Sequence, residues 1–311
     1  MDNEIVLGAI QASTLLTEDQ IRKINDRALN IETLDEIRNA NLDKHERLIA
    51  EAAGGGVQVL GLQEVFSGPF FPALVDESWF QFAEPDDGQT VTRIQELARK
   101  HNMVIVAPFY ERDGGRLYNT TAVIDADGTF LGKYRKSQIP LGDGFNEKYY
   151  FRPGDLGLPV FDTAFCKVGV YVCYDRHFPA GFRVLKERGA QVVFVPSATV
   201  ASTSQKIWEH EAMIRAYDAH LFVVFINRVG QEGVGDLRGT RFYGTSLIVD
   251  PNGWGILAKG SEDKDEVVSA KVNVYRSILN ADSRYQTWRD EREDLGIPQV
   301  AQKKRPLYKS R

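Results

Sequence analysis

The chain of 311 residues is poor in the residues that bind metals or form disulfides, with only two cysteines and five histidines. Cys166 and Cys173 bracket a strand-like run, and an extended run would hold the two thiols about 20 Å apart, beyond disulfide reach. The sequence also lacks a Cys/His cluster at ligand spacing and a phosphate-binding glycine loop. We therefore expect two independent thiols, no metal and no organic cofactor.

Long apolar runs and an excess of positive charge are lacking as well. No 18-residue apolar stretch occurs, and the acidic start, Met1 to Glu4, does not resemble a signal peptide. The net charge is −5, and the basic cluster from Lys303 to Arg311 is interpreted as a solvated tail. These features predict a cytoplasmic protein that binds neither membranes nor nucleic acids.

What the sequence does contain is one pattern of segments used twice, in the same order. The matching pairs are residues 5–10 with 168–172, 56–64 with 189–197, 101–109 with 220–228, and 118–128 with 243–253. The last pair places Asp-Gly or Asn-Gly between strand-like runs, which is typical of a β-hairpin. Each half therefore has an approximate β-α-β-α-β-β order.

Two equivalent sheets with helices on their outer faces would bury such apolar strands on both sides. We therefore predict an α/β fold, a four-layer α-β-β-α sandwich, as a single domain over residues 1–280 with a C-terminal extension at 281–311. The segment 137–157, rich in glycine and tyrosine, is expected to be a functional loop. Helices are predicted around residues 17–53, which Asn39 and Asn41 divide into two, and around 89–101, 178–188 and 205–219.

Cys173 is the first candidate for chemistry, because it lies at the exit of an apolar strand, shortly before a helix-like segment near Pro179. In such a strand-turn-helix elbow, backbone N–H groups and a helix N-terminus lower the pKa of a thiol and stabilise an oxyanion. The pattern is equally typical of a buried apolar cysteine. Cys166 lacks the elbow and is interpreted as structural.

A thiol nucleophile needs a proton acceptor, which is usually histidine. His177, four residues beyond the cysteine, gives weak support for a protease-like Cys-His pair. A carboxylate in a dry pocket does the same work, and Glu64 follows the buried run 57–62, where it either faces a pocket or forms a structural ion pair. Lys136 ends a basic stretch after the first hairpin and is, by itself, typical of a solvated sheet edge.

Taken together, these residues resemble the nitrilase, or carbon–nitrogen hydrolase, superfamily, whose signature is a Glu-Lys-Cys triad on a duplicated α-β-β-α sandwich. The resemblance covers nearly the whole chain. Within the superfamily the chain is most similar to N-carbamoyl amidohydrolases, especially β-ureidopropionase and its bacterial relatives. The segments that carry the resemblance are GKYRKSQIP, GDGFNEKYYFRPGDLGLPVFDT and KVGVYVCYDRHFP between residues 132 and 179, with Gln63-Glu64, 145–147, 196–198 and 226–230.

The resemblance implies a role for each matching residue. Glu64 would be the general base, Lys136 the cation that stabilises the oxyanion, and Cys173 the nucleophile. Glu147 matches a second glutamate that orients the lysine and the attacking water, and the backbone N–H of Tyr174 would complete the oxyanion hole. Without the resemblance, a loop acid such as Glu147 would be read as surface charge.

The expected substrate-binding residues are Arg176, His177 and Ser197. A guanidinium suits a substrate carboxylate, although an ion pair of Arg176 with Asp175 or another acid would look the same in the sequence. Departures from the family pattern leave the pocket shape open. They are Gln138, which replaces the usual histidine, Ala180, which replaces a common acid, and Ser197-Ala198, which replace an Asn-Thr pair.

The hypothesis is a cysteine-dependent amidohydrolase that converts small N-carbamoyl amino acids to amino acid, carbon dioxide and ammonia through a covalent intermediate. The alternatives are an aliphatic amidase or nitrilase with the same triad, or a non-catalytic binding or scaffold protein of the same fold. A homo-oligomer is expected by analogy, with the aromatic segment Tyr285 to Trp288 near an interface. The segment 13–40 has no functional interpretation from the sequence.

Overall fold

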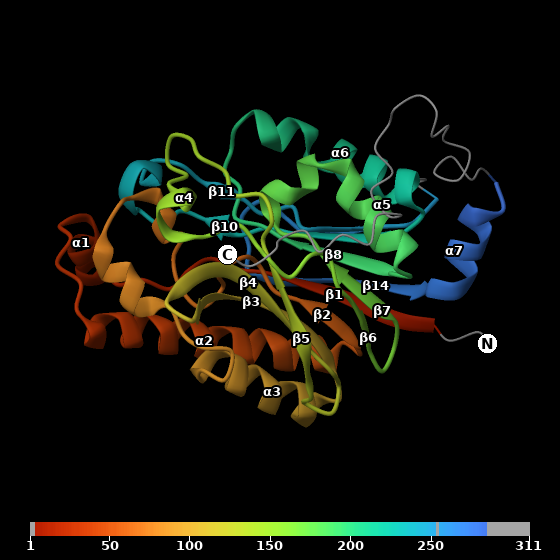
Figure 1. Ribbon diagram of the computed structural model, residues 1–311, viewed down its shortest axis with the longest axis horizontal. Coiled ribbons are helices and arrows are strands. Elements are labelled where there is room, and N and C mark those ends of the chain that lie inside the picture. Colours follow the sequence, from red (N-terminus) through yellow and green to blue (C-terminus); the bar gives the residue numbers. More distant parts are fainter. Residues whose placement is uncertain (1–3, 253–254, 285–311) are drawn as a thin grey trace.

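A computed structural model describes residues 4–252 and 255–284, and its strands form two six-stranded sheets that pack face to face (Figure 1). One sheet runs in the order β14-β1-β2-β3-β4-β5, with β1 (Glu4–Gln11), β2 (Val59–Gly61), β3 (Val104–Asp113), β4 (Arg116–Ile124), β5 (Phe130–Arg135) and β14 (Glu266–Asn273). The other runs in the order β13-β12-β9-β8-β7-β6, with β6 (Val160–Asp162), β7 (Lys167–Val170), β8 (Val192–Pro196), β9 (Phe222–Ile226), β12 (Leu247–Val249) and β13 (Ile256–Lys259). A separate two-stranded ribbon joins β10 (Val229–Gly230) to β11 (Phe242–Tyr243).

The two large sheets have the same internal order, which confirms the predicted duplication. In the first sheet, β1, β2 and β3 are parallel and β4 and β5 continue antiparallel. In the second sheet, β7, β8 and β9 are parallel and β12 and β13 continue antiparallel. Each sheet gains one antiparallel edge strand, β14 beside β1 and β6 beside β7. The helices before β3 and β9 also end alike, with Asn102 and His220 both at φ +50°.

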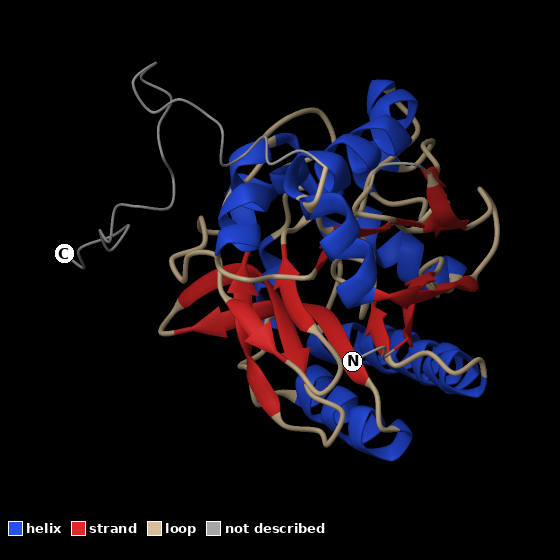
Figure 2. Ribbon diagram, turned by 90° about the vertical axis from the view of Figure 1, so that its right-hand side faces the viewer, coloured by secondary structure: helices blue, strands red, loops and turns tan. Residues whose placement is uncertain are grey.

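Helices cover the outer face of each sheet, which gives the four layers predicted from the sequence (Figures 1 and 2). The layer on the first sheet contains α2 (Ile31–Gly54) and α3 (Gln89–His101), and the layer on the second contains α5 (Pro179–Glu187) and α6 (Thr203–Ala219). Within the described residues, no helix is both long enough and apolar enough to cross a membrane.

One helix boundary was predicted wrongly. The expected interruption at Asn39 and Asn41 lies inside α2, and the break falls instead at residues 26–30, after α1 (Glu18–Asn25). Asn41 is fully buried, and its side-chain amide donates to the carbonyl oxygens of Leu15 and Ile37. The polar side chain is tolerated in the helix because it satisfies a loop that approaches from outside.

The core between the sheets is built from alternate residues of the strands. Val59 and Val104 face the other sheet, whereas their neighbours Leu60 and Ile105 face the helices α2 and α3. At Gly61 the two sheets approach so closely that a Cβ atom would lie 2.3 Å from Cδ1 of Ile226. The sandwich therefore requires glycine at this point.

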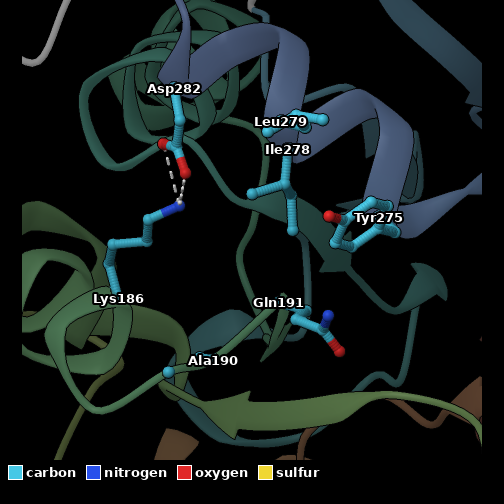
Figure 3. Close-up of a pocket in the computed structure, with 8 residues that line it drawn as sticks. Lys186, Ala190, Gln191, Tyr275, Ile278, Leu279 and Asp282 are labelled. Carbon is cyan, nitrogen blue, oxygen red and sulfur yellow. Dashed lines mark hydrogen bonds and ion pairs between the residues drawn. The ribbon is translucent and has the colours of Figure 1, made fainter.

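Beyond β14, α7 (Val274–Asp282) packs against the second half of the chain (Figure 3). Asp282 Oδ1 accepts hydrogen bonds from Lys186 Nζ at 3.1 Å and from His220 Nδ1 at 2.8 Å. A hollow of about 200 Å³ lies beside this anchor, with Tyr275 and Leu279 on its rim. The helix crosses the predicted domain boundary at residue 280, and the segment from Tyr285 to Trp288 lies outside the described residues, so the extension at an oligomer interface stays a prediction.

Candidate active site

Cys173 lies on a sharp backbone turn at the carboxyl end of β7. The 3₁₀-helix η3 (Cys173–His177) begins at the cysteine, and α5 begins at Pro179, two residues after η3 ends, as the strand-turn-helix pattern predicted. Cys173 has φ +50°, a left-handed conformation that is uncommon for a residue other than glycine. Such strained conformations cluster at functional sites.

Lys136 follows the last residue of β5 and is fully buried, so it does not lie on a solvated sheet edge. Its Nζ donates to Glu64 Oε1 at 2.8 Å and to Glu147 Oε2 at 2.7 Å. Both carboxylates are also fully buried. The structure therefore brings three of the predicted residues, from segments 72 and 11 positions apart, into one direct ion-pair cluster.

In each of the two glutamates, only one carboxylate oxygen accepts a hydrogen bond from Lys136. Glu64 follows β2, and its Oε1 also accepts from Nδ2 of Asn119 at 2.6 Å. Glu147 opens the short helix α4 (Glu147–Tyr150), which the rings of Tyr150 and Phe71 anchor to an aromatic cluster. Within the described part of the chain, Glu64 Oε2 and Glu147 Oε1 have no hydrogen-bond partner. Such buried acceptors are costly unless a reacting group uses them.

The charges of this cluster act on the thiol. Burial raises the pKa of Cys173 to about 12, and the negative charge of Glu64 adds to the rise while Lys136 opposes it. The resting sulfur is therefore a protonated thiol that needs a base at the moment of attack. Burial also raises the pKa of Glu147 to about 7, against the opposing charge of Lys136. Burial disfavours the charge of Lys136, but Glu147 and Glu64 outweigh it and hold the lysine pKa well above its ordinary value.

Asp175, which the sequence offered only as a partner of Arg176, instead links the elbow to the lysine strand. Its carboxylate accepts from the backbone N–H of Val172 at 3.0 Å, from the N–H of Gln138 at 2.8 Å and from the hydroxyl of Tyr134 at 2.7 Å. These donors flank both Cys173 and Lys136 along the chain. No sequence motif indicated the link, because it joins segments about 40 residues apart.

Arg176 and His177 both bind one acid that the sequence did not single out. Arg176 is 2% exposed, and its Nε donates to Glu211 Oε2 at 3.0 Å. His177 Nδ1 lies 2.9 Å from Glu211 Oε1, so the imidazole pairs with Glu211 instead of the cysteine, unlike a Cys-His protease pair. Arg215 contacts the same carboxylate at 3.5 Å. Arg176 also reaches the nucleophile, with Nη1 3.0 Å from the carbonyl oxygen of Cys173 and 3.9 Å from its Sγ.

A hollow of about 210 Å³ opens over the cysteine. Its lining includes Glu147, Cys173, Tyr174, Arg176 and His177, together with Pro140, Leu141, Gly142, Phe145, Thr199, Val200, Ser202 and Ser204. The lining thus draws on the loop 137–157, as expected of a functional loop.

Of the two remaining predicted residues, Tyr174 lines this hollow and Ser197 does not. The N–H of Tyr174 lies in the first turn of η3, where backbone N–H groups have no acceptor within the helix. Ser197 is fully buried, and its hydroxyl donates to the carbonyl of Val195 at 3.1 Å. Ser197 is not among the residues that line the hollow, whereas Thr199, two positions along the chain, is.

Comparison with known proteins agrees with the fold. Residues 28–277 match the carbon-nitrogen hydrolase family model. The chain is 36% identical over 292 residues to an N-carbamoylputrescine amidase of Arabidopsis thaliana, covering 90% of this chain and 96% of that protein. It is 45% identical over 193 residues to a beta-ureidopropionase of the same plant, covering 61% of this chain and 47% of that protein.

A solved structure supports the same assignment. A carbon-nitrogen hydrolase from Helicobacter pylori G27 superimposes with a TM-score of 0.81 at 26% identity, covering 94% of this chain and 97% of the other. The fold, the family match and the two relatives agree with one another. The chain belongs to the carbon-nitrogen hydrolase family of amidohydrolases.

Proposed function

We propose that this protein hydrolyses N-carbamoyl amino acids, with Cys173 as the nucleophile. The observation that supports the proposal most strongly is the buried Glu64-Lys136-Glu147 cluster beside the thiol, in which one oxygen of each glutamate is unpartnered. Attack by Cys173 Sγ on the carbamoyl carbon forms a C–S bond, and Glu64 takes the thiol proton. Because the pKa of the thiol is raised to about 12, transfer to Glu64 accompanies attack and no stable thiolate precedes it.

The oxyanion that forms is stabilised by Lys136 and by the N–H of Tyr174, since fixed donors act most strongly where charge develops. Collapse of this intermediate breaks the carbon–nitrogen bond, and the proton held by Glu64 passes to the leaving amine. A water molecule, deprotonated by Glu64 with help from Glu147, then attacks the carbamoyl thioester. The carbamic acid released decomposes to carbon dioxide and ammonia, and Cys173 regains its proton.

The charge around the hollow favours a substrate with a carboxylate. Glu211 is one negative group among the two guanidinium groups of Arg176 and Arg215, so the cluster keeps a net positive charge even when His177 is neutral. Of the described residues that line the hollow, Glu147 alone is acidic, and it is bound by Lys136. An anionic tail therefore finds a partner in Arg176 or His177, whereas a cationic tail, as in N-carbamoylputrescine, does not.

The test is an ammonia-release assay with N-carbamoyl-β-alanine, N-carbamoyl-α-amino acids of both hands, N-carbamoylputrescine, simple amides and nitriles. We expect kcat/KM for the carboxylate-bearing ureido compounds to exceed that for N-carbamoylputrescine by about tenfold or more, the worth of one charge-assisted hydrogen bond. Cys173→Ala should abolish ammonia release, whereas Cys166→Ala, at the other buried thiol, should retain it. A preference for N-carbamoylputrescine, or for nitriles or amides over all ureido compounds, would refute the proposed substrate class.

A further inference from the structure

Arg228, between β9 and β10, donates hydrogen bonds to the backbone at Glu64. Its side chain is 1% exposed and comes from the opposite half of the duplicated fold. Nε and Nη2 both donate to the carbonyl oxygen of Glu64, at 3.2 and 2.8 Å, and Nη2 also donates to the carbonyls of Val65 and Gly68, the latter at 2.8 Å. The guanidinium thus makes four hydrogen bonds to the three carbonyl oxygens of Glu64, Val65 and Gly68.

The backbone from Glu64 to Gly68, which Arg228 binds, has a strained conformation. Val65 has φ +48°, and a β-branched residue in this left-handed region is a genuine outlier. The turn ends β2 abruptly and leaves the carbonyls of Glu64 and Val65 without a place in the sheet ladder. Buried carbonyls must be satisfied, and a planar fork of N–H donors meets several at once. The left-handed residues Val65 and Cys173 therefore both lie in turns that follow parallel strands, β2 and β7.

The far side of the guanidinium is fixed as well. Nη1 donates to Glu232 Oε1 and to Thr14 Oγ1, each at 2.6 Å. The second oxygen of Glu232 accepts from the backbone N–H of Phe70 at 2.7 Å, on the same loop that Arg228 holds. Thr14 belongs to the segment 13–40, which had no interpretation from the sequence, and its hydroxyl helps orient the arginine. The guanidinium is thereby locked in place at both ends.

We propose that Arg228 is a positioning residue, which fixes the main chain at Glu64 so that the carboxylate meets Lys136 and the Cys173 thiol. The proposal rests on the proposed role of Glu64 as the base. Among the described residues, Arg228 donates no hydrogen bond to a side chain of the cluster and does not itself line the hollow, so we expect it to act through the backbone. Small displacements of a base from its reacting proton lower the rate of the chemical step while leaving substrate binding nearly unchanged.

The test compares Arg228→Lys with a matched control, Arg38→Lys. Arg38 is also buried and donates to a backbone carbonyl, that of Phe82, and its ion-pair partners are Asp35 and Glu84 instead of members of the cluster. Arg228→Lys is expected to lower kcat by about tenfold or more while KM changes by less than about threefold. Arg38→Lys, with a comparable loss in melting temperature, should keep kcat within about twofold of wild type.

A second measurement separates positioning from a general loss of stability. If Arg228 acts through Glu64, the effect of Arg228→Lys on kcat should be smaller in a Glu64→Asp background than in wild type, because the two changes are coupled. Equal effects of the two arginine variants, or a fully multiplicative effect with Glu64→Asp, would overturn the proposal. If Arg228→Lys fails to fold, Glu232→Gln is used in its place. Glu232→Gln is expected to lower kcat by a smaller factor at unchanged KM. An unchanged kcat in this variant would count against a positioning role for Arg228. An inactive wild type would refute the proposed function, whereas an active wild type with unaffected variants would refute only the positioning role.

Discussion

The hydroxyl of Tyr134 donates a 2.7 Å hydrogen bond to Asp175 Oδ2, and this contact joins the two halves of the active site. Tyr134 lies in β5 of the first sheet, two residues before Lys136, and Asp175 lies in η3, which follows β7 of the second sheet, two residues after Cys173. Both side chains are fully buried, and burial raises the pKa of Asp175 to about 6. We call the hydrogen bonds of Asp175 with Tyr134, Gln138 and Val172 the Asp175 brace, and we infer that this brace holds Lys136 and Cys173 at a fixed separation.

Removal of that brace should reduce the rate more than binding. Asp175→Ala deletes the acceptor for Val172, Gln138 and Tyr134, and we expect kcat to fall about 100-fold, the cost of a misplacement near 1 Å. Asp175→Asn keeps one acceptor oxygen and should retain more activity than the alanine variant. Steady-state kinetics with the best ureido substrate measures both. Asp162→Ala, at an exposed acid of β6, is the control and should match wild type.

The ionisation of Glu147 should appear in the pH profile. Because burial raises its pKa to about 7, Glu147 is protonated below that pH, where it no longer pairs as an anion with Lys136 and cannot take a proton from water. We expect kcat/KM to fall as the pH drops through about 7, and Glu147→Gln to be slower and to lack this acidic limb. An identical limb in the glutamine variant would assign the titration to another group.

The same shift predicts a change in stability. A carboxyl whose folded pKa is raised from 4.5 to about 7 contributes stability that is fully present below pH 4.5 and is lost as the pH rises through about 7. Glu147→Gln cannot titrate, so its free energy of unfolding should vary less than that of wild type across this interval. Urea denaturation at pH 5 and pH 8 measures the difference. An equal pH dependence in both proteins would contradict the assignment.

Loss of the lysine charge should destabilise the whole fold. Lys136→Met leaves the buried carboxylates of Glu64 and Glu147 without their shared cation, which costs about 3–5 kcal/mol in comparable buried pairs. Adding Glu147→Gln to this variant should restore part of the stability, because one uncompensated charge disappears. Lys167→Met, which removes an exposed pair with Asp162, is expected to change the free energy of unfolding by less than about 1 kcal/mol. A stable Lys136→Met protein would show that the cluster is not ionised.

Gly61 offers a test of the close contact between the sheets. In Gly61→Ala the new methyl would meet Ile226 at 2.3 Å and Phe194 at 2.6 Å, so one sheet must move. Overpacking of this kind costs about 1–3 kcal/mol. Gly239→Ala, where no heavy atom lies within 4 Å, is the control. Equal melting temperatures for the two variants would contradict a tight contact at this point.

The sequence by itself determined the architecture. Apolar strands buried on both faces, two hairpins with Asp-Gly or Asn-Gly turns, and the repeated order of segments specify two equivalent sheets covered by helices, because these signals are local and periodic. The family resemblance added the candidates Glu64, Lys136, Glu147 and Cys173. Local patterns failed at the break in the first helix, since Asn41 is satisfied by a distant loop.

Only the tertiary structure decided how those candidates meet. The brace at Asp175, the acid Glu211 shared by Arg176 and His177, and the grip of Arg228 on the Glu64 backbone all join residues far apart in the chain. A buried carboxylate or guanidinium must find a partner, but the sequence does not specify which one, because the choice depends on the packing of the two sheets.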